Sequence, residues 1–202
     1  MSFSSEWFEK EFQAAPVMAI LRGMGVERSL ELAAVAWDLG IHAVEVPIQS
    51  ATDREALAAV VEAGAARGKK VGAGTIVDRT TAAQAAEAGA AFTVSPGLDI
   101  DVVRESERLG MPSIPGVATA SEVQLAGREG LTWLKAFPAA VLGPSWFTTM
   151  RGPFPDVRFV ATGGINARNA SSFLDAGVRV VAVGSALADQ TELARLAEVM
   201  GR

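Results

Sequence analysis

The chain has 202 residues, of which 50% are hydrophobic and 20% are charged, enough for one sizeable core but too little for two full domains. With 18 basic and 23 acidic residues the net charge is -5, and no segment gathers lysine and arginine as a nucleic-acid or anionic-lipid surface would require. The absence of cysteine and the single histidine exclude disulfides, thiol catalysis and thiolate or multi-histidine metal sites. We therefore expect no nucleic-acid or membrane partner and no redox or zinc chemistry.

The N-terminal segment, residues 1–14, carries three glutamates and lacks the continuous apolar core of a secretory signal. No later run approaches membrane-spanning length, so we expect a soluble, cytoplasmic protein. In a helix over residues 1–14, the side chains of Trp7, Phe8 and Phe12 would share one face. This pattern predicts an N-terminal helix that caps the fold.

The rest of the chain alternates between short runs rich in valine and isoleucine and alanine-rich amphipathic segments. The runs predict strands at 17–22, 42–48, 70–75, 92–96, 112–117, 132–138, 157–164 and 180–185. The segments predict helices at 28–39, 53–67, 80–88, 100–109, 120–128, 145–151, 166–176 and 191–200. The expected N-cap residues are Thr52, Asp78, Asp99, Thr119 and Asn166, and several helices should end at glycine.

Eight strand–helix units in regular alternation predict a closed parallel sheet, because right-handed crossovers connect such units and eight of them leave no edge. A doubly wound open sheet is the structural competitor, but no dinucleotide-type glycine pattern follows the first strand. The expected fold class is α/β: a single-domain (β/α)8 TIM barrel over residues 1–202. Functional side chains of such a barrel gather at the C-terminal ends of its strands.

Lys135 is a primary amine inside the apolar, strand-like segment 131–138. Side chains alternate along a strand, so Trp133, Lys135 and Phe137 share one face. Burial there would lower the pKa of the amine and let it attack a carbonyl carbon. For an isolated lysine, the commoner arrangement is a buried stem with the ammonium reaching solvent at the strand end.

Glu45 lies on the strand face opposite Val44 and Val46, so its carboxylate also enters the predicted barrel. A strand glutamate alone is more often an ion-pair partner than a proton shuttle. A buried glutamate together with a buried lysine favours imine chemistry with proton transfer.

Further candidate residues end the other predicted strands. They are Arg22, Thr75, Pro96, the pair Pro115 and Gly116, Thr162 with Gly163 and Gly164, and Gly184 with Ser185. In a barrel of this kind the loops after strands seven and eight commonly hold phosphate. The two glycine turns there favour a phosphorylated substrate, the alternative being turns that need glycine for backbone reasons alone.

Seven segments in chain order resemble those of one enzyme family. They are residues 19–23 (AILRG), 44–47 (VEVP), 72–75 (GAGT), 95–97 (SPG), 114–117 (IPGV), 134–138 (LKAFP) and 162–165 (TGGI). Together they resemble the 2-keto-3-deoxy-6-phosphogluconate and 2-keto-3-deoxy-6-phosphogalactonate aldolases over about residues 15–200. The resemblance implies a barrel, a homotrimer, and reversible aldol cleavage to pyruvate and glyceraldehyde 3-phosphate with no metal or organic cofactor.

The resemblance also assigns roles. Lys135 would form a Schiff base with the keto group, and Glu45 would be the general acid/base. Arg22 and Thr75 would hold the carboxylate of the pyruvyl unit. The apolar walls would be Pro96 and Phe137, and the phosphate contacts Gly163, Gly164, Gly184 and Ser185, with Thr162 a further substrate-binding candidate.

One departure bears on the substrate. Many phosphogluconate-type members carry an arginine where this chain has Gln49, so the carboxylate clamp would fall to Arg22, and the local sequence looks closer to the phosphogalactonate branch. Two alternatives stay open: the same lysine chemistry on 4-hydroxy-2-oxoglutarate or another unphosphorylated keto acid, and a sugar-phosphate isomerase or binding protein in which the lysine never becomes covalent.

Overall fold

The computed structural model describes residues 3–13 and 15–201, except for the side chains of Phe3, Ser185, Ala186 and Gln190. This part of the chain forms an α/β fold with nine parallel strands in the order β5-β4-β3-β2-β1-β9-β8-β7-β6. The strands are β1 (Val17–Ile20), β2 (Val44–Pro47), β3 (Val71–Gly74), β4 (Phe92–Val94), β5 (Ser113–Ile114), β6 (Gly116–Val117), β7 (Trp133–Ala136), β8 (Arg158–Thr162) and β9 (Val180–Val183).

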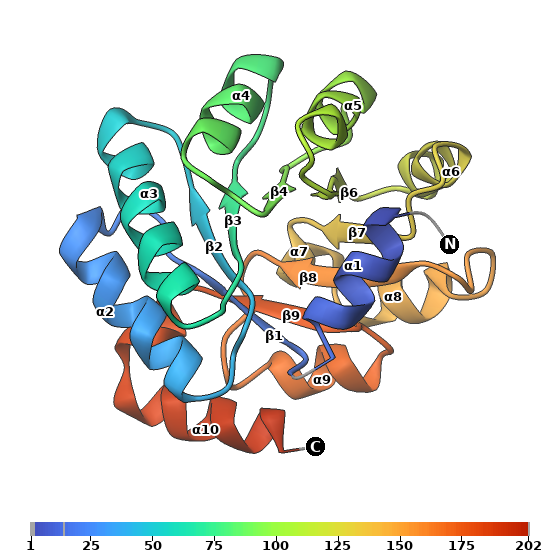
Figure 1. Ribbon diagram of the computed structural model, residues 1–202. Helices are drawn as coiled ribbons and strands as arrows, with labels where there is room; N and C mark the ends of the chain where they lie inside the picture. Colours follow the sequence, from blue (N-terminus) through green and yellow to red (C-terminus); the bar gives the residue numbers. More distant parts are fainter. Residues whose placement is uncertain (1–2, 14, 202) are drawn as a thin grey trace.

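Strands β5 and β6 stand at the two ends of that order, yet only Pro115 separates them in the chain. Proline has no N–H to donate to a neighbouring strand, which explains the interruption. Its carbonyl oxygen still accepts a hydrogen bond from Lys135 N at 2.9 Å. The strands therefore form a nearly closed parallel barrel surrounded by helices, as Figure 1 shows, and the single strand predicted at 112–117 is two short pieces.

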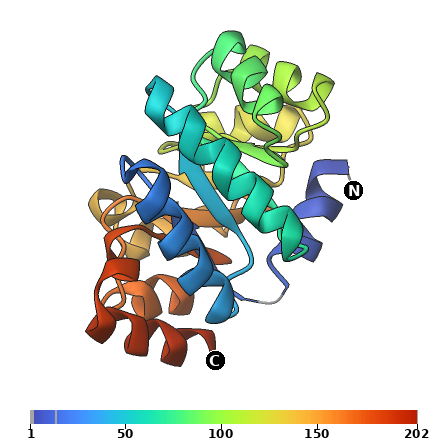
Figure 2. The same ribbon diagram turned by 60° about the vertical axis from the view of Figure 1, so that its left-hand side comes forward.

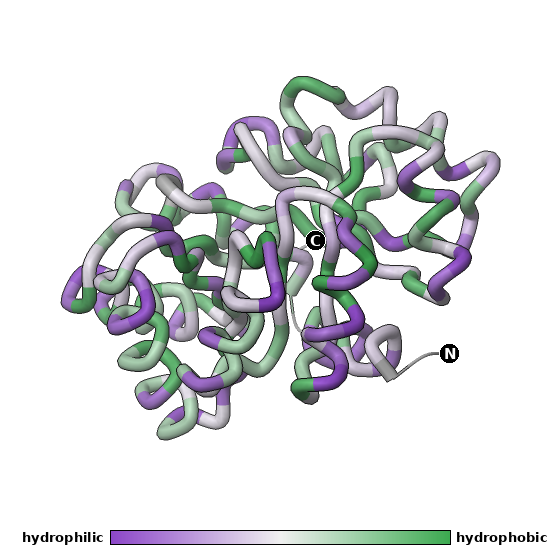
Figure 3. Tube along the Cα trace, turned by 90° about the horizontal axis from the view of Figure 1, so that it is seen from above, coloured by the Kyte–Doolittle hydropathy of each residue, from purple (hydrophilic) through white to green (hydrophobic). Residues whose placement is uncertain are grey.

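The surrounding helices follow the predicted segments closely. They are α2 (Gly25–Asp38), α3 (Ala51–Ala66), α4 (Arg79–Glu87), α5 (Ile100–Arg108), α6 (Ala120–Arg128), α8 (Pro144–Met150), α9 (Ala170–Asp175) and α10 (Gln190–Met200). Two short elements were not predicted, α7 (Ala139–Leu142) and the 3-10 helix η1 (Ser185–Ala188). Figure 3 shows hydrophilic residues recurring along these helices, in alternation with hydrophobic ones.

The predicted N-caps Asp78, Asp99 and Thr119 are confirmed, because each side chain accepts a hydrogen bond from the first turn of its helix. The other two predictions were wrong. Helix α3 is capped by Ser50, whose extended backbone lets Oγ accept from Asp53 N at 3.2 Å. Helix α9 begins only after Asn169, since the side chain of Asn166 closes the preceding turn instead.

Strand side chains alternate between two apolar layers, as predicted. Leu134 and Ala136 of β7 pack in the outer layer, between the sheet and the helices. Trp133 belongs to a separate inner cluster with Met18 and Phe92. Lys135 must therefore point into the barrel from the face that Trp133 occupies, two residues further along β7.

Helix α1 (Phe3–Glu11) packs against the inner cluster. The ring of Phe8 lies 5.9 Å from that of Phe92, and the ring of Phe12 lies 5.1 Å from that of Trp133. Phe92 and Trp133 begin their strands, so these contacts are at the N-terminal end of the barrel. Figure 2 shows α1 at one end of the molecule, opposite the segment around residues 139–150.

Within residues 3–13 and 15–201, no helix combines the length and apolar character needed to cross a lipid bilayer.

Candidate active site

Lys135 and Glu45 are the buried charged pair of the barrel. The lysine on β7 is 2% exposed and the glutamate on β2 is fully buried. Burial lowers the pKa of Lys135, while Glu45 raises it and Arg22 lowers it further. Burial likewise raises the pKa of Glu45, against the lowering effects of Lys135 and then Arg22. The amine is thus shifted toward its neutral, nucleophilic form beside a carboxyl group whose pKa is shifted upward.

The carboxylate of Glu45 occupies space above the neighbouring strand that only a glycine leaves open. A Cβ atom at Gly74, at the end of β3, would overlap Glu45 Oε1. Neither carboxylate oxygen has a hydrogen-bond partner among the described residues. Buried polar atoms without partners are rare in folded proteins, and here they leave the carboxylate free to accept a proton from a bound substrate or water.

Arg22, which follows β1, carries the guanidinium at the mouth of the barrel. Its Nη1 donates hydrogen bonds to Thr75 Oγ1 at 3.2 Å and to Gln49 Oε1 at 2.7 Å. Thr75 has a φ of 61°, a backbone conformation that costs energy for a β-branched residue and often marks a functional site. A guanidinium fixed from two sides beside a hydroxyl group suits the binding of a carboxylate.

An aromatic ring lies beside the amine. Lys135 Nζ lies 5.1 Å from the ring centroid of Phe137, a side chain that is 37% exposed. The ring of Phe137 also lies against Gly163, where an added Cβ would come within 3.0 Å of it. Pro96 packs its carbonyl group against Gly116, the register partner of Lys135. Of the two residues predicted as walls, Phe137, directly after β7, has its ring beside the amine, whereas Pro96, after β4, contacts the strand next to Lys135 through its backbone carbonyl.

The two predicted glycine turns follow neighbouring strands. Thr162 ends β8, pairs in register with Ala182 of β9, and has a buried hydroxyl group without a described partner. Gly163 and Gly164 follow it with φ values of 94° and 75°, which residues with a Cβ rarely adopt. Gly184 follows β9, and a Cβ there would lie 3.3 Å from Ile20 O.

The structure links five of the predicted residues by direct contact or electrostatic interaction: Lys135, Glu45, Arg22, Thr75 and Phe137. The glycine turns lie on the same rim. The side chain of Ser185 falls outside the described part, although its backbone opens η1.

Two structural features of the site were not predicted. Gln49 was noted only as a departure from the family pattern, whereas its amide oxygen holds the guanidinium of Arg22. Gly74 lies in the motif at residues 72–75, but its closeness to Glu45 depends on how β2 and β3 pair. Among the described residues, no group of three or more histidine, aspartate or glutamate side chains is placed to hold a metal ion.

Comparison with known proteins agrees with this geometry. The model of the family described as KDPG and KHG aldolase matches residues 8–199. A Rhizobium meliloti protein named probable 2-dehydro-3-deoxy-6-phosphogalactonate aldolase is 34% identical over 173 residues, covering 85% of this chain and 81% of that protein. A 2-dehydro-3-deoxy-phosphogluconate aldolase of Pseudomonas aeruginosa is 36% identical over 166 residues, covering 82% and 73%.

A solved structure gives the same result at the level of the fold. The KDPG aldolase of Legionella pneumophila, with pyruvate captured as a covalent carbinolamine intermediate, superposes with a TM-score of 0.80 at 30% identity. The match covers 93% of both chains. With the family model spanning nearly the whole sequence, these similarities show that the chain belongs to the KDPG and KHG aldolase family.

Proposed function

We propose that this protein is a class I aldolase that cleaves a 2-keto-3-deoxy-6-phospho-sugar acid to pyruvate and glyceraldehyde 3-phosphate. The observation that carries the proposal is the buried amine of Lys135, shifted toward its neutral form in the barrel interior beside the buried carboxyl group of Glu45. Burying an amine costs free energy. A binding protein, or an isomerase that works without an imine, has no use for an amine in that position, so nothing in its function would offset this cost.

The chemistry follows from these two groups. Lys135 attacks the C2 keto carbon, and loss of water from the carbinolamine gives a protonated imine. Glu45 accepts the proton of the C4 hydroxyl group while the C3–C4 bond breaks and its electron pair moves to the imine nitrogen, releasing glyceraldehyde 3-phosphate. Glu45 then returns the proton to C3 of the enamine, and water hydrolyses the imine to free pyruvate and Lys135. These steps require no metal and no organic cofactor.

The remaining candidates position the substrate. Arg22 and Thr75, joined by a hydrogen bond, bind the carboxylate of the pyruvyl unit. The apolar side chains of Phe137 and Pro96 border the imine and exclude water, which favours the neutral lysine. The phosphate group binds at the glycine turns after β8 and β9, through Gly163, Gly164, Gly184 and Ser185, with Thr162 nearby.

The preferred sugar acid is part of the same proposal. With Gln49 where many phosphogluconate-type members have arginine, the carboxylate clamp falls to Arg22 and the local sequence looks closer to the phosphogalactonate branch. We therefore propose 2-keto-3-deoxy-6-phosphogalactonate as the better substrate, ahead of the phosphogluconate epimer. An unphosphorylated keto acid such as 4-hydroxy-2-oxoglutarate remains the competing substrate, because it uses the same imine chemistry.

We further propose that residues 1–202 form one (β/α)8 aldolase domain, in which the helix within residues 1–14 caps the N-terminal end. The aromatic contacts of Phe8 and Phe12 support this capping role. We expect a homotrimer, as the family resemblance implies, and a cytoplasmic location, where phosphorylated sugar acids are produced. Light scattering coupled to size exclusion tests the trimer.

The substrate proposal is tested by offering the purified enzyme the two phosphorylated epimers and 4-hydroxy-2-oxoglutarate, with pyruvate release followed by a coupled lactate dehydrogenase. We expect both phosphorylated acids to be cleaved, the galactonate faster, and the unphosphorylated acid to be the poorest substrate. Fastest cleavage of 4-hydroxy-2-oxoglutarate would reject the phosphorylated substrate class, and no pyruvate from any of them would reject the aldolase function.

A further inference from the structure

Glu192 is a buried carboxylate for which the proposed catalytic steps have no use. It lies in the first turn of α10 and is 8% exposed. Its Oε2 accepts a hydrogen bond from the backbone N–H of Ala167 at 2.9 Å, and its Oε1 accepts one from Arg168 Nε at 3.2 Å. Arg195, one turn further along α10, adds an ion pair at 3.6 Å. Two guanidinium groups and one amide thus compensate the buried charge.

The segment that Glu192 contacts is the continuation of the glycine turn after β8. Asn169 Nδ2 donates to Gly164 O at 2.9 Å, and Asn169 Oδ1 accepts from Asn166 N at 2.9 Å. Asn169 N in turn donates to Asn166 Oδ1 at 3.2 Å. Because these bonds brace residues 164–169, a displacement at Ala167 would be transmitted to Gly164.

Helix α10 is in turn connected to the second glycine turn. Gly184 is followed directly by η1, in which Leu187 N donates to Gly184 O at 3.2 Å. Asp189 then caps α10 by accepting from Thr191 N at 2.7 Å. Glu192, three residues after that cap, therefore joins the loop after β8 to the loop after β9 across 25 residues of sequence.

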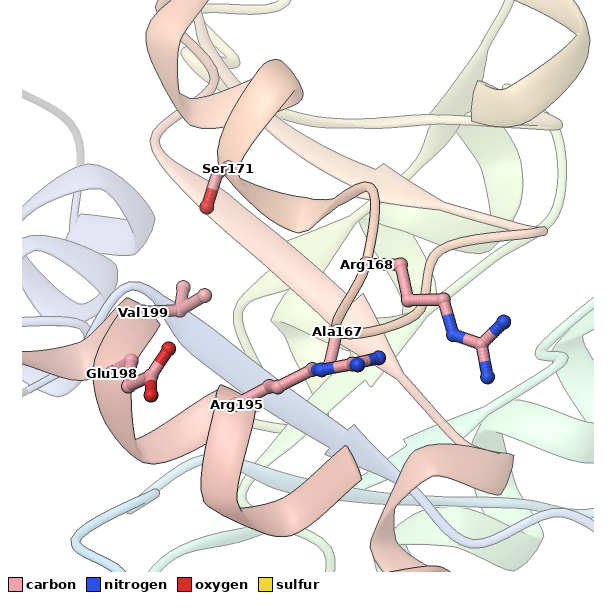
Figure 4. A pocket seen from close by; sticks show the side chains of 6 residues that line it. All are labelled: Ala167, Arg168, Ser171, Arg195, Glu198 and Val199. Atoms are coloured by element: carbon pink, nitrogen blue, oxygen red, sulfur yellow. The ribbon is translucent and has the colours of Figure 1, made fainter. Parts of the chain in front are cut away.

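Figure 4 shows the surroundings of this link: Arg195 extends from α10 toward Ala167 and Arg168 on the loop before α9. These three residues line a hollow together with Ser171, Glu198 and Val199. If the carboxylate of Glu192 were removed, Arg168 and Arg195 would lose their shared acceptor and Ala167 N–H its buried partner. The two loops would then be free to separate.

We propose that Glu192 is a positioning residue for the phosphate group of the substrate: by tying the loop after β8 to α10, it fixes the spacing of the two glycine turns. This inference rests on the proposed function, since it assumes that those turns bind phosphate. Backbone amides from two separate loops bind one phosphate well only when both loops are held in register with it.

A residue that merely stabilises the fold would affect every substrate alike, whereas a residue that positions the phosphate turns affects phosphorylated substrates selectively. The test compares kcat and KM for the phosphorylated keto acid and for the same acid without its phosphate, in wild type, Glu192→Ala, Glu192→Gln and Glu198→Gln. Glu198→Gln is the matched control, because it makes the same charge change on the same helix beside the same hollow.

We expect Glu192→Ala to lower kcat/KM for the phosphorylated acid about ten-fold or more, mainly through KM, within the roughly hundred-fold that a misplacement of 1 Å can cost. The unphosphorylated acid should change less than about two-fold, the scatter expected between sites that do not interact. Glu192→Gln keeps an acceptor for Ala167 N–H and should show a smaller loss, and inhibition by inorganic phosphate should weaken in parallel. Glu198→Gln should match wild type.

If both Glu192 variants leave the ratio of kcat/KM for the phosphorylated acid to that for the unphosphorylated acid as in wild type, the inference is overturned while the proposed function stays intact. If Glu192→Ala does not fold, the ratio measured with Glu192→Gln and its inhibition by inorganic phosphate decide the same question. A wild-type enzyme that does not prefer the phosphorylated acid would instead overturn the phosphate part of the proposed function and, with it, this inference.

Discussion

The carboxylate of Glu45 lies directly over Gly74, so that a methyl group at position 74 would overlap Glu45 Oε1. The two residues are on adjacent strands, β2 and β3, and the missing side chain on β3 is what gives the buried carboxylate its place in the barrel. The atoms displaced by such a methyl group would be the end of a flexible side chain rather than backbone. A substitution at Gly74 should therefore act on catalysis, by moving the carboxylate of Glu45, with little effect on folding.

Gly74→Ala is expected to lower turnover about hundred-fold, the loss typical of a misplaced general acid/base, while the midpoint of urea unfolding changes little. The new methyl group pushes the Glu45 carboxylate away from the substrate without moving the strands. Turnover is measured by pyruvate release, with Glu45→Gln alongside. An alanine variant as active as wild type would show that the position of the carboxylate does not matter to the reaction.

Gly116→Ala is the matched contrast, because there an added Cβ would meet the backbone carbonyl of Pro96 instead of a side-chain end. Backbone yields less readily, so this variant should lose about 1–3 kcal/mol of unfolding free energy, as overpacked cores do. Urea unfolding of the two glycine variants, followed by circular dichroism, should rank Gly116→Ala as clearly the less stable.

The pH dependence of lysine reactivity should respond oppositely to the two charged neighbours of Lys135. Ionised Glu45 raises the pKa of the amine and Arg22 lowers it. Glu45→Gln should therefore shift the reactivity profile of Lys135 to lower pH, and Arg22→Met should shift it to higher pH. The profile is measured with a small neutral acylating reagent, so that carboxylate binding does not enter. Shifts in the reverse order would mean that these charges do not act on the amine as the structure indicates.

The buried pair of Lys135 and Glu45 should cost stability. Replacing both members by apolar residues of similar volume, Lys135→Met with Glu45→Leu, removes two buried polar groups at once, and such replacements are often neutral or stabilising by about 1–4 kcal/mol. Each single variant leaves one group buried without its partner and should be less stable than the double variant. Urea unfolding of all four proteins completes the cycle, and a double variant less stable than both singles would contradict it.

Gln49 should tune the carboxylate clamp. Its amide oxygen lies 2.7 Å from Arg22 Nη1, so a carboxylate in its place would pair with the guanidinium and compete with the substrate. Gln49→Glu should raise KM for pyruvate in the aldol addition about ten-fold, the factor that corresponds to about 1.4 kcal/mol, with kcat less affected. Gln49→Met, which removes the hydrogen bond without adding charge, should cause a smaller rise. A KM for Gln49→Glu equal to that of wild type would place the substrate carboxylate elsewhere.

Much of this site could be predicted because the sequence pattern itself encodes it. Alternation along β7 places Lys135 on the inner face with Trp133. The repeat of strands and helices predicts the barrel in which that face is the interior. The end of β7 then lies on the rim where such barrels carry their chemistry.

The remainder depends on how segments distant in the chain pack together, which the pattern of one sequence does not show. The space that Gly74 leaves for Glu45 follows from the pairing of β2 with β3, and the bond between Glu192 and Ala167 from the packing of α10 on a distant loop. Local competition also misled the prediction at Asn166, which resembles an N-cap but uses its side chain to close the turn before α9. Local side-chain hydrogen bonds, in addition to capping propensity, decide where that helix begins.

The most direct test of the account is to trap the imine. The chain has four lysines, Lys10, Lys69, Lys70 and Lys135. The first three therefore serve as internal controls for adduct formation on Lys135. Incubation with pyruvate and borohydride, followed by peptide mass mapping, should reduce the imine to a stable adduct on Lys135 alone, and Lys135→Met should give none. An adduct on another lysine, or no adduct in an enzyme that releases pyruvate, would contradict the proposed mechanism.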